Sequence, residues 1–280
     1  MQDPRSIRRD AAAAQGAEAV TITHDGRYVA PSGAVVEIAH HVERALEGCT
    51  HHPPSERLPT PPVGERSTRI VTRGVSTLAA ARALVDAGRD VAALNFASAR
   101  NPGGGFLNGA RAQEESLCRA SSLYACLVNA PMYPPHRAAR DPMYTSWTLY
   151  APLVPVFRGD DGALLEKPWR CSFITSPAPN VKVLLERTPD REGELPGVYD
   201  ERIARVLSVA AMNGHDAVVL GAWGCGAFGG SAELVAGRFE RALSGAFRGV
   251  FDEVVFAVLD TSHDRHTIGP FERRFPLDDR

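Results

Sequence analysis

Residues 95–115 read NFASARNPGGGFLNGARAQEE. They begin at the end of a predicted strand, residues 91–95, whose apolar run is of the kind found in strands buried on both faces of a parallel or mixed sheet. Ligands of open α/β sheets bind where such strands end at their carboxyl side. The stretch therefore predicts an α/β domain whose binding site begins directly after this strand.

The loop combines glycines with acids. A run of three glycines leaves it without side-chain walls, so we expect its backbone N–H groups to approach a ligand directly. The run is Gly103, Gly104 and Gly105. At its far end stand an amide and two carboxylates, Gln113, Glu114 and Glu115. An N–H cradle beside paired acids suits cleavage of a glycosidic bond next to a phosphate.

A second glycine loop lies between a predicted strand, 217–220, and a predicted helix, 231–244. It matches GxGxxG, the dinucleotide-binding pattern, but it comes late in the chain. The acidic residue expected about 20 residues further on is also missing, since Asp260 follows about 30 residues later. We therefore interpret the loop as a diphosphate site formed by backbone N–H groups. Its residues are Gly224, Cys225, Gly226, Ala227, Phe228 and Gly229.

The glycine triplet followed by Gln-Glu-Glu resembles the signature of the poly(ADP-ribose) glycohydrolases, and most closely their compact bacterial-type members. The resemblance covers roughly residues 21–275, with support from the segments 176–180, 224–230 and 256–260. It implies a macrodomain, here a three-layer α/β/α fold with a mixed central sheet. It also implies hydrolysis of ribose–ribose bonds at the ends of poly(ADP-ribose), with release of ADP-ribose.

The resemblance further implies roles for individual residues. Glu115 is the expected general acid, which protonates the leaving ribose hydroxyl and then helps to deprotonate water. Glu114 is expected to orient the ribose, and Asn101 to contact the terminal ribose. Phe228 would pack over that ribose, while Asn95 contacts substrate or satisfies loop backbone groups. An acid that acts at neutral pH needs a raised pKa, which partial desolvation would give Glu115.

Composition excludes other classes of protein. The net charge of −2 provides no overall basic field for nucleic acid, so no direct nucleic-acid binding is expected. No apolar run reaches the length of a membrane span. The five cysteines form no CxxC pair, which is typical of reduced thiols in a cytoplasmic protein.

We expect no cofactor, no metal and no catalytic role for Cys225. The group of polar residues around His263 is interpreted as a polar loop.

The order of predicted helices and strands along the chain indicates an N-terminal extension, residues 1–65, that packs on a catalytic core, residues 66–280. The extension is expected to hold a helix over 4–18, a hairpin over 19–38 around Asp25-Gly26, and an extended connector over 51–64. In the core we expect strands at 69–72, 91–95, 147–158, 171–175, 217–220 and 254–259. Helices are expected at 78–87 (capped by Ser76 or Thr77), 113–128, 201–213 and 231–244, with a proline-rich lid or rim loop at 131–142.

Three other functions remain open. One is a hydrolase of mono-ADP-ribosyl groups on protein or nucleic acid, which would use the same acid on a different leaving group. Another is a non-catalytic ADP-ribose reader, which would need no carboxylate pair. The third is an NAD-dependent oxidoreductase, which would leave the glycine triplet unexplained. Which modified macromolecule is the target does not follow from the sequence.

Overall fold

The computed structural model describes residue 3 and residues 6–278. Its helices, with the two 3-10 turns marked η, are α1 (Arg9–Asp25), α2 (Ala39–Glu47), α3 (Thr77–Asp86), η1 (Phe106–Asn108), α4 (Gln113–Ala120), α5 (Leu123–Leu127), α6 (Tyr133–Ala139), α7 (Val181–Arg187), η2 (Pro189–Glu194), α8 (Leu195–Met212), α9 (Ala232–Ser244) and α10 (Gly269–Glu272). Its strands are β1 (Arg27–Val29), β2 (Val35–Glu37), β3 (Thr50–His52), β4 (Arg69–Arg73), β5 (Val91–Phe96), β6 (Thr148–Arg158), β7 (Leu164–Ser176), β8 (Ala217–Leu220) and β9 (Glu253–Ala257).

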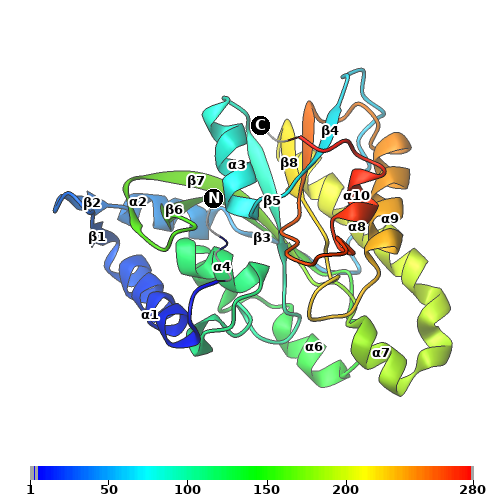
Figure 1. Cartoon of the computed structure of the whole chain (residues 1–280), viewed down its shortest axis with the longest axis horizontal. Helices are drawn as coiled ribbons and strands as arrows, with labels where there is room; N and C mark the ends of the chain where they lie inside the picture. Colours follow the sequence, from blue (N-terminus) through cyan, green and yellow to red (C-terminus); the bar gives the residue numbers. More distant parts are fainter. Residues whose placement is uncertain (1–2, 4–5, 279–280) are drawn as a thin grey trace.

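A seven-stranded mixed sheet in the order β3-β6-β7-β5-β8-β9-β4 forms the middle layer. The pairs β7–β5, β5–β8, β8–β9 and β9–β4 are parallel, whereas β6 runs antiparallel to both its neighbours. Helices cover both faces, with α3 and α4 on one side and α8, α9 and α10 on the other (Figure 1). This confirms the expected three-layer α/β/α fold with a mixed central sheet.

Strand β5 shows how the layers are joined. Its side chains alternate between the faces of the sheet: Val91 and Ala93 pack in the core cluster shared with α3 and α4, and Ala92 and Leu94 in the cluster shared with α8 and α9. All four are almost fully buried. A strand buried on both faces reads as a continuous apolar run, and the prediction of this strand is confirmed.

Several other predicted elements are confirmed within one or two residues. They are β4, α3, β8, α9 and β9. The hydroxyl of Ser76 accepts from the N–H of Ala79 at 3.0 Å and so caps α3, and Ser231 caps α9 in the same way through Leu234. Capping side chains satisfy N–H groups that a helix start leaves unpaired, which is why these boundaries are visible in the sequence.

The predicted hairpin around Asp25-Gly26 is wrong. Helix α1 runs on to Asp25, and Gly26 ends it in the left-handed conformation, with φ of 68°. Glycine adopts the left-handed conformation without strain, and this conformation occurs both at helix ends and in tight hairpin turns. The pair Asp25-Gly26 therefore fits either structure. The hairpin lies later, where β1 pairs with β2. The start of the predicted helix at residues 4–5 lies outside the described residues.

Three further boundaries differ from the prediction. The helix expected over 113–128 is interrupted at Ser121, whose extended backbone forms an antiparallel bridge with Val156. The proline-rich segment 131–142 contains α6, because prolines are tolerated in the first turn of a helix. Strand β7 and helix α8 both begin several residues before the sequence suggests.

The N-terminal segment is tied to the rest of the chain. Strand β3 pairs with β6 at the edge of the central sheet. Arg158, almost fully buried, donates to Glu18 of α1 at 2.6 Å. The division at residue 65 stays a prediction, and β3 belongs to the same sheet as the strands beyond it. Among the described residues, none of the helices is long and apolar enough to cross a membrane.

Candidate active site

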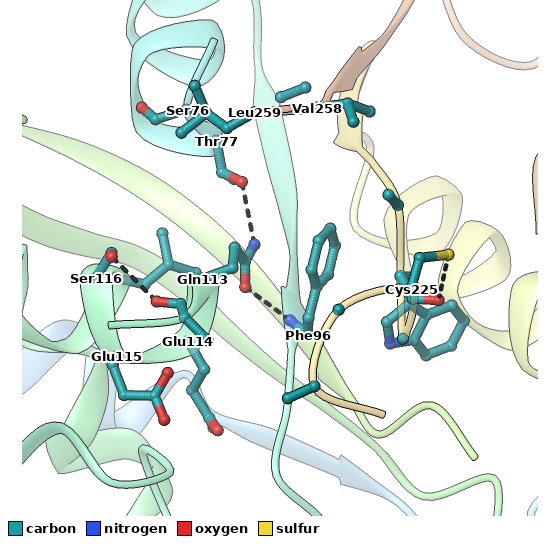
Figure 2. A pocket seen from close by; sticks show the side chains of 18 of the residues that line it. Ser76, Thr77, Phe96, Gln113, Glu114, Glu115, Ser116, Cys225, Val258 and Leu259 are labelled. Atoms are coloured by element: carbon teal, nitrogen blue, oxygen red, sulfur yellow. Dashed lines mark hydrogen bonds between the residues drawn. The ribbon is translucent and has the colours of Figure 1, made fainter. Parts of the chain in front are cut away.

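A cavity of about 380 Å³ opens where β5, β8 and β9 end. The first residues after these strands line it, together with the starts of α3 and α4 (Figure 2). Because β5 and β8 are neighbours in the sheet, the two glycine-loop regions lie on adjacent strand ends. The lining includes Gln113, Glu114, Glu115 and the whole run from Gly224 to Phe228.

Gln113 anchors the first turn of α4 to the sheet. Its Oε1 accepts from the backbone N–H of Phe96 at 2.9 Å, and its Nε2 donates to the carbonyl of Leu94 at 2.7 Å. The same Nε2 donates to Oγ1 of Thr77 at 3.1 Å (Figure 2). The amide thus joins the end of β5, α3 and α4, so Gln113 fixes where the acids begin.

Glu114 is held by the loop after β5. Its side chain is buried, with 2% of the residue exposed, and accepts from the N–H of Ser98 at 2.7 Å. It also accepts from Nδ2 of Asn95 at 3.4 Å and from the N–H of Gly103. Burial raises the pKa of Glu114 to about 8; the hydrogen bond from Ser98 opposes this rise, and the nearby charge of Glu115 adds to it.

Glu115 has one fixed oxygen and one free oxygen. Oε1 accepts from the N–H of Gly105 at 3.0 Å. Oε2 is buried and has no hydrogen-bond partner in the part of the chain that the structure describes. The two neighbouring glutamates extend to the same side of α4 (Figure 2). A buried carboxylate oxygen is costly without a partner, and this one belongs to a pocket-lining residue.

The glycine triplet does not present the N–H cradle that we expected. The N–H of Gly103 donates to Glu114 and that of Gly105 to Glu115, while the N–H of Gly104 donates to the carbonyl of Asn101 at 2.9 Å. A Cβ on Gly104 would lie 2.2 Å from Oε1 of Glu115, so any other residue there would displace this carboxylate, and the φ of 61° also favours glycine. The triplet therefore supports the acids, because only glycine allows the backbone to come so close.

The second glycine loop does offer free donors. Within the described residues, the N–H groups of Gly224, Gly226, Ala227 and Phe228 meet no acceptor. Helix α9 begins shortly after, at Ala232, and its positive end favours anions. Unpaired N–H groups of this kind form anion-binding concavities, so the diphosphate site expected at this loop stays a prediction.

The predicted site residues divide into two groups. Gln113, Glu114, Glu115 and residues 224–228 line the cavity, whereas the triplet, Gly229, Asn95 and Asn101 do not. Asn95 is fully buried behind Glu114, where its Nδ2 also donates to Thr175 at 3.1 Å. Asn101 is exposed, and its N–H donates to the hydroxyl of Ser98.

Some residues that line the cavity were not among the predicted site residues. Phe96, Thr77, Val258 and Leu259 also line the cavity (Figure 2), and so does Ser98. A signal for them was present, because Phe96 and Ser98 follow the predicted strand β5, and Val258 and Leu259 stand at the end of the last one. Residues just beyond the carboxyl ends of parallel strands are ligand-site candidates whatever their side chains.

The fold and the pair of acids in its pocket define a macrodomain-like α/β protein with a site suited to glycosidic bonds. Residues 16–159 match the family model described as the microbial-type PARG catalytic domain. The chain belongs to this family, the microbial-type poly(ADP-ribose) glycohydrolases. No curated protein matches it.

Solved structures of the family are close in sequence and in fold. The chain is 47% identical to the poly(ADP-ribose) glycohydrolase of Thermomonospora curvata, with a TM-score of 0.89 over 95% of this chain and 100% of that one. The same enzyme bound to the inhibitor ADP-HPD gives 46% identity, a TM-score of 0.87 and the same coverage. The enzyme of Deinococcus radiodurans in complex with ADP-ribose gives 38% identity and a TM-score of 0.78 over 85% of this chain and 98% of that one.

Proposed function

We propose that the protein is a poly(ADP-ribose) glycohydrolase that hydrolyses ribose–ribose O-glycosidic bonds at chain ends and releases ADP-ribose. Family membership and the similarity to the two bacterial enzymes support the activity. The observation that carries the proposal is Oε2 of Glu115. This buried acid oxygen has no partner among the described residues, and the cavity it belongs to also contains backbone N–H groups that meet no described acceptor.

The cavity fits one unit of such a substrate. Its volume of about 380 Å³ lies in the usual range for small-molecule sites. The loop Gly224–Phe228 supplies N–H donors for the diphosphate. Among the described residues that line the cavity there is no lysine or arginine, which leaves that task to the backbone. Phe228 lines the cavity and is half-buried at this loop, which supports the proposal that its ring packs on the terminal ribose.

Glu115 is the proposed general acid and base. Protonated on Oε2, it would donate to the oxygen of the leaving ribose while the bond to the anomeric carbon breaks. The positive charge that develops at the sugar is stabilised by the carboxylate that remains. The same carboxylate then takes a proton from the attacking water, and ADP-ribose is released.

The neighbouring residues support this acid. Gly105 holds Oε1, so that the free oxygen has a defined direction. Glu114 orients the ribose from the cavity side, and one of its carboxyl oxygens accepts from the N–H of Ser98. Gln113 and Asn95 are positioning residues, because their amides bond to the protein. No step requires a metal.

Purified protein should be incubated with poly(ADP-ribose) without added metal, beside Glu115→Gln, and the products separated by chromatography. Gln keeps the shape of Glu115 and an oxygen for the N–H of Gly105, so the variant should fold and bind ADP-ribose in calorimetry. We expect ADP-ribose from the wild type and a loss of turnover of at least about 1,000-fold in the variant. Intact polymer from both proteins, with ADP-ribose still bound, would point to a reader or to another ADP-ribosyl linkage.

A further inference from the structure

Three arginines that form no ion pair with any described residue belong to two joined segments beside the cavity. Arg100 belongs to the loop after β5, whereas Arg137 is in the last turn of α6 and Arg140 follows directly after it. Nη1 of Arg137 donates to the carbonyl of Arg100 at 2.7 Å, which joins the two segments. In the part of the chain that the structure describes, none of the three forms an ion pair, and Nε of Arg100 is buried without a partner. We call Arg100, Arg137 and Arg140 the rim arginines.

The rim arginines are tied to both walls of the cavity. On one side, the hydroxyl of Ser98 accepts from the N–H of Arg100 at 3.3 Å, and the N–H of Ser98 holds Glu114. On the other side, the ring of Tyr144 lies 5.7 Å from that of His136 on α6 and 6.2 Å from that of Phe228. Because Ser98 and Phe228 both line the cavity, the segment from α6 to Tyr144 borders its mouth.

This segment is a built structure. Arg140 and Tyr144 adopt left-handed backbone conformations, with φ of 54° and 56°, which side chains other than glycine rarely take. The surroundings hold them there: the N–H of Tyr144 donates to the carbonyl of Asp141 at 3.2 Å, and the N–H of Thr145 to Nε2 of buried His136 at 3.2 Å. Unfavourable backbone conformations that the structure enforces concentrate at functional sites.

The charges around the rim are positive. The nearest acid in the segment, Asp141, is bound by Arg191, which also binds Glu194. Lys182 is exposed, and its N–H donates to the carbonyl of Phe228 at 2.9 Å, so it adds a cation on the far side of the mouth. The chain as a whole carries a net charge of −2. A local group of free cations in an acidic protein favours a local anionic partner.

We propose that the rim arginines bind the diphosphate of the polymer unit that adjoins the unit in the cavity. The inference rests on the proposed function. A chain end in the cavity leaves the next unit outside, within reach of the mouth, and each unit of poly(ADP-ribose) carries a diphosphate. Guanidinium groups bind phosphate oxygens through two parallel N–H donors. The rim arginines therefore hold polymer but have no role in binding free ADP-ribose.

The test compares polymer with monomer in charge variants. Arg137→Gln keeps a donor for the carbonyl of Arg100 and loses the charge, whereas Arg137→Lys keeps both. Arg140→Gly removes a second charge at a left-handed position that glycine adopts without strain, so the variant should fold, and its thermal unfolding is measured beside its KM. Arg241→Ala, an exposed arginine in the last turn of α9, is the matched control.

We expect the KM for poly(ADP-ribose) to rise about 3- to 10-fold in Arg137→Gln and in Arg140→Gly at low salt, with kcat unchanged. Arg137→Lys and Arg241→Ala should stay near wild type. The dissociation constant of ADP-ribose should not change in any variant. The effect should shrink at high salt, because exposed charges are screened.

Unchanged KM values in both charge-loss variants would overturn the inference, as would equal losses in Arg137→Gln and Arg137→Lys. A parallel loss of ADP-ribose affinity would place the arginines at the cavity itself. An oligonucleotide with the same number of negative charges serves as a competitor. If it competes as well as poly(ADP-ribose), the rim arginines form a general polyanion surface, which would also contradict the inference. If the wild type releases no ADP-ribose, the proposed function fails and not this inference. Binding of poly(ADP-ribose) to the same variants, measured by retention of the polymer on filters, then tests the rim arginines without turnover.

Discussion

The backbone N–H of Gly105 donates a 3.0 Å hydrogen bond to Oε1 of Glu115, and this bond separates the two oxygens of the proposed acid. One oxygen is fixed by the loop, and the other is buried without a protein partner in the described part of the chain. The glycine loop and the acid are thus one structural unit. Changes in the loop should act on catalysis through the position of Glu115.

Gly104→Ala should inactivate the protein. A Cβ at this position would lie 2.2 Å from Oε1 of Glu115, so the carboxylate must move, and a misplacement of about 1 Å can cost about 100-fold in kcat. Gly88→Ala is the control, because its φ of 82° imposes a similar backbone strain while no atom of the described residues lies within 4 Å of the new Cβ. Both variants should lose about 1 kcal/mol or more of stability, but only Gly104→Ala should lose kcat. Normal turnover by Gly104→Ala would separate the loop from the acid.

Gln113→Ala should destabilise the fold and slow the reaction. The change leaves the N–H of Phe96 and the carbonyl of Leu94 without their side-chain partner, at a cost of about 1–3 kcal/mol in urea unfolding. Thr77→Val removes only the 3.1 Å contact to the same amide and should cost less. If Gln113→Ala unfolds at the wild-type urea concentration, the amide does not anchor α4.

Glu114→Gln should become relatively more stable as the pH rises. Folded Glu114 binds its proton up to pH about 8, whereas an ordinary glutamate, with a pKa of 4.5, binds it only at lower pH. Between these values the folded state holds more protons, so the wild type loses stability as pH increases through this window. Gln has no proton to lose, and its advantage should reach on the order of 1–3 kcal/mol at pH 8. Thermal unfolding between pH 5 and 8 measures the difference; a parallel pH profile for both proteins would contradict it. Exposed Glu186→Gln should show no trend.

Cys225→Ala should retain turnover. Burial raises the pKa of the Cys225 thiol to about 12, and its Sγ faces the carbonyl of Trp223 at 3.7 Å. A thiol that stays protonated at neutral pH is a poor nucleophile. We expect kcat within about 3-fold of wild type and no inactivation by iodoacetamide in either protein. A loss comparable to that of Glu115→Gln would give the thiol a part in the chemistry.

The strongest sequence predictions rest on local physics. The run 91–95 was predicted as a buried strand because its first four residues are apolar, and Ser76 and Ser231 mark helix starts through their own hydroxyls. The signature Gly103–Glu115 identified the acids through its likeness to a family. The hairpin at Gly26 failed because a left-handed glycine ends helices as well as forming turns.

The sequence by itself determined the α/β layers, the family and the two acids, since these follow from hydrophobic periodicity and from a contiguous motif. Only the tertiary structure decided which backbone donors remain free for a ligand. The triplet gives its N–H groups to Asn101, Glu114 and Glu115, while the loop 224–228 keeps several of its own. It also brought Arg100 and Arg137 together across 37 positions of sequence. Hydrogen-bond partners depend on which segments meet in space, and no local pattern encodes that meeting.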